Sequence, residues 1–281
     1  MATIDTIADR STGSAIAGKA YFETSTNKLI VFNGSAWIEL DSDGTGAVYE
    51  NRWGASFDGT GDFVDCGNIS VLSNASSLTI SGWFKFNTLD TLCLTSGSSL
   101  SNRIYFYVTG TGSLSIYFDG LNPMTSSINL STSQWYHLAL IKDGNGSNNL
   151  KLFINGSLSD GATGSFTSAT GSNAGDNLWI GSASAYTGLP LDGLADEVAV
   201  WGSALSNSDV VAIYNSGTPT DLSSLTPTGY WRMGDDSNDT ATSGGSIATI
   251  TDSSGNGNDA VQATASKQPT FSDLTGETIY V

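Results

Sequence analysis

Basic residues are scarce in this chain of 281 amino acids. The 10 Lys and Arg residues stand against 27 Asp and Glu, which gives a formal net charge of −17 at pH 7. Phosphate backbones and anionic lipid surfaces repel a chain with so little positive charge to neutralise them. The composition therefore excludes nucleic acids as partners and gives no support for insertion into a membrane.

Histidine and cysteine are nearly absent. The single histidine, His137, would have to serve any Ser/His/Asp or Cys/His mechanism and any zinc site that uses imidazole. Cys66 and Cys93 lie 27 positions apart, which matches neither a metal ribbon nor a CxxC redox pair. We interpret His137 as a structural strand residue and both cysteines as buried side chains in a reducing compartment, with a disulfide as the alternative.

The chain also lacks a long apolar run. No segment approaches the roughly 18 apolar residues of a membrane-spanning helix. Residues 1–10 lack the basic and apolar regions of a secretory signal peptide. We therefore expect a soluble protein that is made without a signal peptide.

Glycine, serine, threonine and asparagine are abundant instead. There are 33 glycines, and only 13% of residues are charged, against a globular norm of about 25%. This composition is typical of short strands joined by many turns. Within residues 77–86, Leu78, Ile80, Phe84 and Phe86 share one face of an alternating segment. A regular succession of such segments predicts an all-β fold, a two-sheet antiparallel sandwich.

Differences in composition and in the pattern of strand-like segments divide the chain into two domains, 1–48 and 49–281. Residues 18–40 read as a meander of three short strands, in which Asn33 and Gly34 form a hairpin turn. So small a meander cannot bury its own large apolar side chains. We therefore expect it to attach the chain to a partner or to other copies of itself. The residues concerned are Tyr21, Phe22, Ile30, Phe32, Trp37 and Ile38.

One short helix interrupts the strands. Ser206 and Asp209 have the spacing of a capping box, and Gly217 with Pro219 supplies a stop signal. The residues that follow, 219–281, contain further short strand-like runs.

The region 50–217 resembles the laminin-G-like branch of the concanavalin A-like jelly-roll superfamily. The resemblance rests on five stretches in the family's order, which are 55–64, 78–84, 134–139, 150–156 and 193–205. It implies a concanavalin A-like jelly roll. In that family a segment like 230–234, followed by one like 252–258, opens the domain, whereas here both come late. We infer a circular permutation that keeps 219–281 in the same domain, because the ends of a jelly roll lie near each other.

The segment 20–40 is similar to a small β-segment of bacteriophage tail-fibre, head-fibre and capsid-associated proteins. Beside a lectin-like jelly roll, this resemblance implies a virion surface protein that is made in the host cytoplasm. Its expected partners are capsid or tail proteins and further copies of itself. The oligomeric state that the resemblance suggests is a trimer.

The function implied is that of a non-enzymatic capsid decoration or fibre component that displays its lectin-like domain toward host-surface glycans. The alternatives are a lectin or adhesin outside any virion, and a glycan hydrolase. Retaining glycosidases need two carboxyl groups about 5 Å apart. No two of the glutamates lie within ten residues of each other, and they are Glu23, Glu39, Glu50, Glu197 and Glu277. We therefore expect no enzymatic activity.

Calcium is the cofactor that the resemblance implies, because lectin-like members often carry a structural Ca²⁺ bound by six to eight oxygen ligands. Five aspartates are candidate ligands, namely Asp58, Asp62, Asp65, Asp192 and Asp196. Asp196 is the first candidate because it stands in a matching stretch. The alternative is that the Asp-Gly pairs form turns and need no ion.

A sugar-binding site would need aromatic rings beside polar side chains. The candidates are Tyr186, Trp179, Trp53 and Trp231. Tryptophans of a two-sheet protein also fill the core between the sheets, so a core position is the alternative for each tryptophan.

Overall fold

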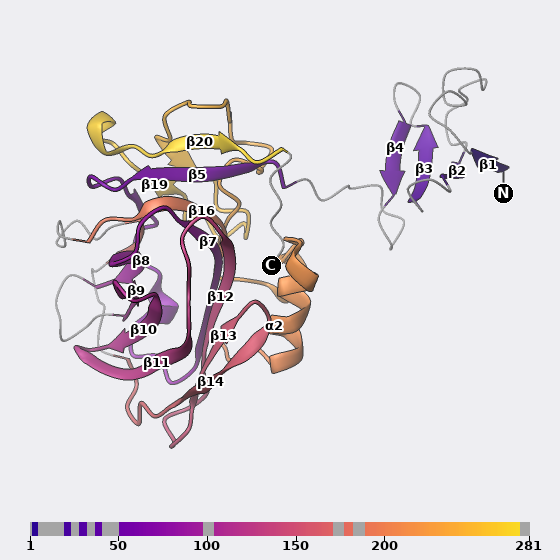
Figure 1. Cartoon of the computed structure of the whole chain (residues 1–281). Coiled ribbons are helices and arrows are strands. Elements are labelled where there is room, and N and C mark those ends of the chain that lie inside the picture. The colour runs from indigo at the N-terminus through magenta and orange to yellow at the C-terminus, as the bar shows by residue number, and fades with distance from the viewer. Residues whose placement is uncertain are drawn as a thin grey trace. The chain divides into compact units, whose positions relative to one another are not determined.

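A computed structural model of the chain describes residues 2–4, 20–23, 28–32, 37–40, 51–97, 104–170, 177–181 and 189–275. The chain divides into two compact units, Met1–Glu50 and Asn51–Val281, and each has its own sheets (Figure 1). Among the described residues no helix is long and apolar enough to cross a membrane.

The first unit contains one four-stranded sheet. Its strands, in order, are β1 (Ala2–Ile4), β2 (Ala20–Glu23), β3 (Lys28–Phe32) and β4 (Trp37–Leu40). The last three form the antiparallel meander that the sequence predicts, and β1 adds to it in parallel. Phe22 pairs with Leu29, which pairs with Leu40, while Val31 pairs with Ile38.

The second unit is a sandwich of two antiparallel eight-stranded sheets, so the prediction of an all-β two-sheet jelly roll is confirmed. The first sheet runs β14 (Ser157–Gly164), β13 (Leu150–Ile154), β12 (Trp135–Lys142), β7 (Leu78–Phe86), β16 (Asp192–Trp201), β5 (Trp53–Asp58) and β20 (Thr270–Asp273), and β17 (Gly229–Trp231) pairs with β16. The second sheet runs β11 (Leu121–Asn129), β10 (Ser113–Phe118), β9 (Ile104–Val108), β8 (Thr91–Ser96), β15 (Leu178–Ile180), β6 (Val64–Asp65), β19 (Ala260–Val261) and β18 (Thr249–Ile250).

The core lies between the two sheets. Leu78, Ile80, Phe84 and Phe86 of β7 are all buried in it, as their alternation predicts. Apolar residues of β9, β10 and β15 meet them from the second sheet. The edge strand β11 was not evident from the sequence, because it is polar and contains Pro123. A proline is tolerated at an edge, where no ladder donor is required.

The residues after the helix contribute to both sheets. The strand β17 pairs with β16, β18 and β19 extend the second sheet, and β20 pairs with β5. The first strand of the sandwich, β5, therefore lies between β16 and β20, two strands from much later in the chain.

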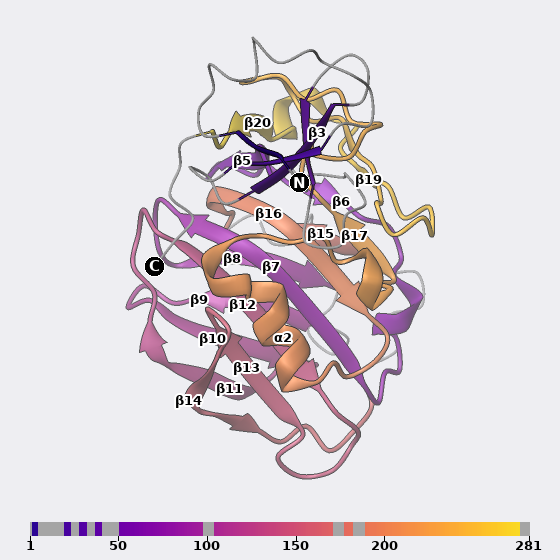
Figure 2. The same cartoon turned by 90° about the vertical axis from the view of Figure 1, so that its right-hand side faces the viewer.

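The helix α2 (Asn207–Tyr214) begins at the predicted capping box, in which Ser206 and Asp209 bond reciprocally. It covers the outer face of the first sheet (Figure 2). Val210 packs there against Ile141 and Phe153, and Tyr214 stacks on Trp83. One-turn helices lie at Ser70–Leu72, Asn215–Gly217, Ser223–Leu225 and Ala265–Lys267.

His137 is fully buried on this helix-covered face. Its Nε2 atom is hydrogen-bonded to Oγ of Ser81 at 2.7 Å, while Nδ1 has no partner. Burial lowers the pKa of His137 from 6.5 to about 3. The imidazole is therefore neutral at physiological pH and inaccessible to a ligand.

Candidate functional site

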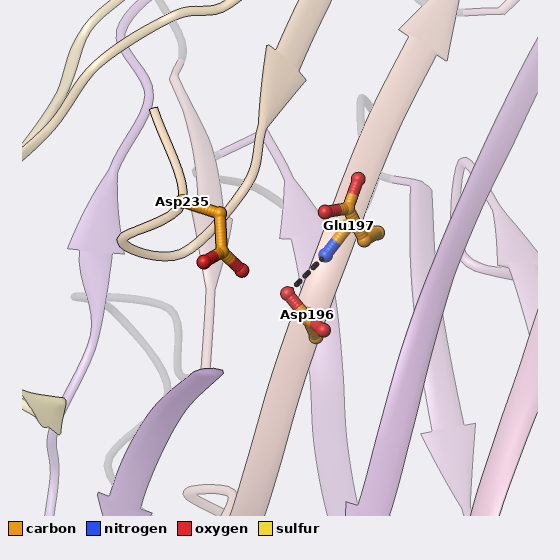
Figure 3. Close-up of side chains that lie close together, drawn as sticks. All are labelled: Asp196, Glu197 and Asp235. Atoms are coloured by element: carbon orange, nitrogen blue, oxygen red, sulfur yellow. Dashed lines mark hydrogen bonds between the residues drawn. The ribbon is translucent and has the colours of Figure 1, made fainter. Parts of the chain in front are cut away.

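Three carboxylates meet at the centre of β16. Asp196 and Glu197 lie on β16 and Asp235 follows β17, and one carboxylate oxygen of each lies within 4.8 Å of the others (Figure 3). The pairing of β16 with β7 is interrupted between Asp196 and Ala199, and Glu197 has a φ of 48°. Because a bulge breaks the alternation of a strand, two consecutive acidic residues are both buried here.

Protein donors surround this carboxylate cluster. Asn51 Nδ2 donates to Asp196 Oδ2 and the Glu197 amide donates to Oδ1, both at 2.9 Å. The Tyr230 hydroxyl donates to Glu197, and the Asp235 carboxylate accepts the backbone amides of residues 52 and 53. A cation also approaches the cluster, since Arg232 Nε lies 3.4 Å from Glu197 Oε1.

The cluster is electrostatically unbalanced. Burial, and then the neighbouring charge of Glu197, raise the pKa of the fully buried Asp196 well above its usual value. The side-chain oxygen of Asn51 is also buried and accepts no hydrogen bond. Carboxylate and amide oxygens are the donors that Ca²⁺ prefers. The residues present thus fit a hard divalent cation, which would be held by Asp196, Glu197, Asp235 and the Asn51 oxygen.

Of the five predicted metal ligands, only Asp196 lies in this cluster. Asp58 and Asp192 pair across β5 and β16, and Asp62 Oδ2 accepts the Asp58 amide at 3.2 Å. Asp65 lies in the second sheet, where it accepts Gly67 N and Asn177 Nδ2. Burial, and then the charge of Asp58, raise the pKa of Asp62 to about 6. These four carboxylates are used in turns and strand ends.

Glu197 and Asp235 were not identified from the sequence. Glu197 is adjacent to Asp196, and an alternating strand would have placed it on the opposite face. Asp235 lies 39 residues from Asp196, and only the pairing of β17 with β16 brings the two together. No local spacing could have indicated it.

A second group of side chains forms a row across the outer face of the second sheet. Tyr117, Tyr105, Thr95, Trp179 and Asp65 are successive register partners on β10, β9, β8, β15 and β6. Their neighbours along each strand are buried in the core, so the row faces outward. We call it the aromatic row.

The aromatic row combines stacked rings with unpaired polar atoms. The rings of Tyr105 and Tyr117 stack with centroids 4.3 Å apart and an interplanar angle of 7°. Thr95 is 1% exposed and Trp179 is 7% exposed. Thr95 Oγ1 and Trp179 Nε1 are both buried without a hydrogen-bond partner. A buried polar atom without a partner is costly, because it has lost its hydrogen bond to water.

The predicted sugar-binding aromatic residues do not gather at one site. Trp179 lies in the aromatic row, and Tyr186 lies outside the described residues. Trp53 is half-buried, with the Arg52 guanidinium 4.7 Å from its ring centroid. Trp231 is fully buried in the core and donates Nε1 to the Asn258 carbonyl. Tyr105 was missed, although the alternation in 104–108 could have indicated an outward ring.

The family model that matches the chain is Laminin_G_3, of the concanavalin A-like lectin/glucanases superfamily, and it covers residues 58–211. The chain belongs to this family. None of the curated proteins compared with the chain is significantly similar to it.

Three solved structures illustrate the likeness of the fold. A Bacteroides ovatus protein, named as a candidate carbohydrate-binding protein, is 17% identical with a TM-score of 0.61, over 92% of this chain and 70% of its own. The heptameric SAP-like pentraxin of Limulus polyphemus is 17% identical with a TM-score of 0.45, over 60% of this chain and 84% of its own. The CBM40 of a Ruminococcus gnavus IT-sialidase, bound to α2,3-sialyllactose, is 18% identical with a TM-score of 0.45, over 57% of this chain and 96% of its own.

Proposed function

We propose that the second unit is a non-enzymatic glycan-binding domain whose ligand contacts the aromatic row. The observation that carries the proposal is the stacked pair of partly exposed rings, Tyr105 and Tyr117, on the outer face of the second sheet. The C–H face of a sugar can rest on an aromatic ring, while sugar hydroxyls bond to a phenol hydroxyl. The name of the Bacteroides ovatus protein is in keeping with this proposal.

A hydrolase is the weaker alternative. The carboxylate cluster has the close spacing that retaining glycosidases use. However, Asp196 is 0% exposed and Glu197 is 2% exposed, so no glycosidic bond can reach them without opening of the sandwich. Glu197 is also held by Tyr230 and Arg232. We infer that this cluster has a structural role.

Calcium binding at the carboxylate cluster is part of the proposal. Two observations support it, namely the raised pKa of the buried Asp196 and the unpartnered Asn51 oxygen. A bound cation would neutralise the cluster and tie Asn51, at the start of the second unit, to β16 and to Asp235. It would thereby stabilise the sandwich without contacting the glycan.

The first unit is proposed to attach the domain to a larger assembly. Support comes from the large apolar residues of so small a sheet, which are Tyr21, Phe22, Ile30, Phe32, Trp37 and Ile38. The similarity of the segment 20–40 to phage fibre and capsid-associated proteins favours a virion surface as that assembly, with several copies displaying their glycan-binding domains together. A lectin outside any virion accounts equally well for the second unit.

The glycan proposal is tested on an array of neutral and acidic oligosaccharides, followed by titration of any that bind. Tyr105→Ala removes one of the two stacked rings, and we expect it to weaken binding about tenfold. Val211→Ala, which shortens an exposed apolar side chain on α2, is the control and should bind normally. Absence of binding to every oligosaccharide, or an unchanged affinity in Tyr105→Ala, would contradict the proposal.

A further inference from the structure

A pocket of about 410 Å³ lies away from the carboxylate cluster and the aromatic row. It opens where the segment 223–228 meets the turn 251–259, which connects β18 to β19. Its lining consists of Pro227 and of residues with hydroxyl or carboxamide side chains, which are Ser223, Thr226, Thr228, Ser253, Ser254 and Asn256. None of the described residues in the lining is charged or aromatic.

Hydrogen bonds fix the two walls of this pocket to each other. Asn256 Nδ2 donates to the carbonyl oxygens of Pro227 at 3.3 Å and Thr228 at 3.2 Å. Ser254 Oγ also donates to the Thr228 carbonyl, at 3.2 Å. Because the turn and the facing segment are bonded directly, the pocket exists before any ligand arrives. A preformed site avoids part of the cost of ordering on binding.

The acidic residues beside the pocket are occupied by protein donors. Asp221 accepts both the amide and the hydroxyl of Ser223. Asp252 accepts the amides of Tyr230, Ser254 and Asn258. These carboxylates therefore build the walls of the pocket instead of offering charge to a ligand.

Polar atoms in the lining remain available. Within the described part of the chain, the Thr226 and Thr228 hydroxyls and the Asn256 side-chain oxygen make no hydrogen bond. Thr226 ends the one-turn helix Ser223–Leu225 in the left-handed conformation of a C-cap, with φ 49° and ψ 59°. Its side chain is exposed at the pocket.

We propose that this pocket binds one unit of a neutral saccharide, at a site separate from the aromatic row. Hydroxyl and amide groups can donate to and accept from sugar hydroxyls, and the volume lies within the range of small-ligand pockets. A carboxylated sugar is disfavoured, because the pocket offers it no cation and the chain carries a net charge of −17. The site goes beyond the proposed function by giving the domain a second point of contact, through which one branched or long glycan gains affinity.

The probes are methyl glucoside and methyl galactoside, with glucuronate and galacturonate as their acidic counterparts. Each is titrated to about 50 mM, as weak single-sugar affinities require, while the methyl NMR signals of Thr226 and Thr228 are followed. We expect a neutral glycoside to shift both signals and the acidic counterparts to leave them in place. The double variant Thr226→Val/Thr228→Val should weaken binding about tenfold, and Thr167→Val, an exposed threonine elsewhere, should not.

The variant Tyr105→Ala separates this site from the aromatic row. It should leave the shifts at Thr226 and Thr228 unchanged, even if the aromatic row binds nothing. The proposal is overturned if neither methyl signal moves with either neutral glycoside, if the acidic sugars bind as tightly, or if Tyr105→Ala abolishes the shifts.

Discussion

Asn51 donates its side-chain amide to Asp196 at 2.9 Å, although the two residues lie 145 positions apart. Its side-chain oxygen is buried without a hydrogen-bond partner. The bond joins the beginning of the second unit to the middle of its longest strand. In the proposed calcium site this oxygen would serve as a ligand.

Calcium is expected to raise the melting temperature of the wild-type protein through linkage, because it binds the folded state. Asp196→Asn should lose this gain. In the presence of a chelator the same variant should be at least as stable as the wild type, since the buried like charges no longer repel each other. Thermal unfolding with and without Ca²⁺ measures both effects, with Asp143→Asn as an exposed control. A melting curve that calcium leaves unchanged in the wild type would exclude the site.

Acid should destabilise the fold through His137. Its folded pKa of about 3 lies below the unfolded value of 6.5, so its contribution is fully present above about pH 6.5 and is lost as the pH falls toward 3. Relative to His137→Gln, the wild type should lose about 3 kcal/mol of unfolding free energy between about pH 7 and about pH 4. Carboxylates that titrate in this range are common to both proteins and cancel in the difference. Parallel pH profiles for the two proteins would show that His137 is not buried in this way.

A chain that ends at Gly217 should aggregate. It lacks β17 to β20, so the edges of β16 and β5 are left open, and Trp231 and Phe271 are missing from the core. Light scattering and thermal unfolding of the shortened protein provide the measurement. A soluble product with the full melting temperature would refute both this expectation and the circular permutation.

The first unit should determine the oligomeric state. We expect the full chain to form a trimer and a chain that begins at Val48 to be monomeric, as measured by multi-angle light scattering. Phe32→Glu replaces one of the large apolar residues of the small sheet by a charged one and should dissociate the oligomer. Lys28→Glu changes a polar position of the same strand and should have less effect. A monomeric full chain, or an oligomer that persists without residues 1–47, would contradict the proposal.

The elements that could be predicted from the sequence are those with strictly local signals. The alternation in β7 gives its buried face directly, and the spacing of Ser206 and Asp209 gives the start of the helix. The carboxylate cluster could be predicted only in part. Asp196 stands in a matching stretch, but Glu197 depends on a bulge and Asp235 on the pairing of β17 with β16.

The aromatic row could not be predicted for a related reason. Trp179, Thr95 and Tyr105 come from three separate segments, and they align only through the register of three neighbouring strands. A register shift of one residue in any of these strand pairings would move the side chains of the shifted strand from the outer face to the core. Register across a sheet is a long-range property, and the residues of one strand do not encode it.

The position of β5 between β16 and β20 has a consequence for synthesis of the chain. As the polypeptide leaves the ribosome, β5 emerges first among the strands of the sandwich, but neither of its neighbours exists until most of the chain has been translated. The hairpin of β12 and β13 can form early, because its strands are close in sequence. The sandwich closes only after the last strands arrive, so the nascent protein exposes open sheet edges for nearly its whole translation, and slow folding at high expression should favour misassembly between neighbouring nascent chains.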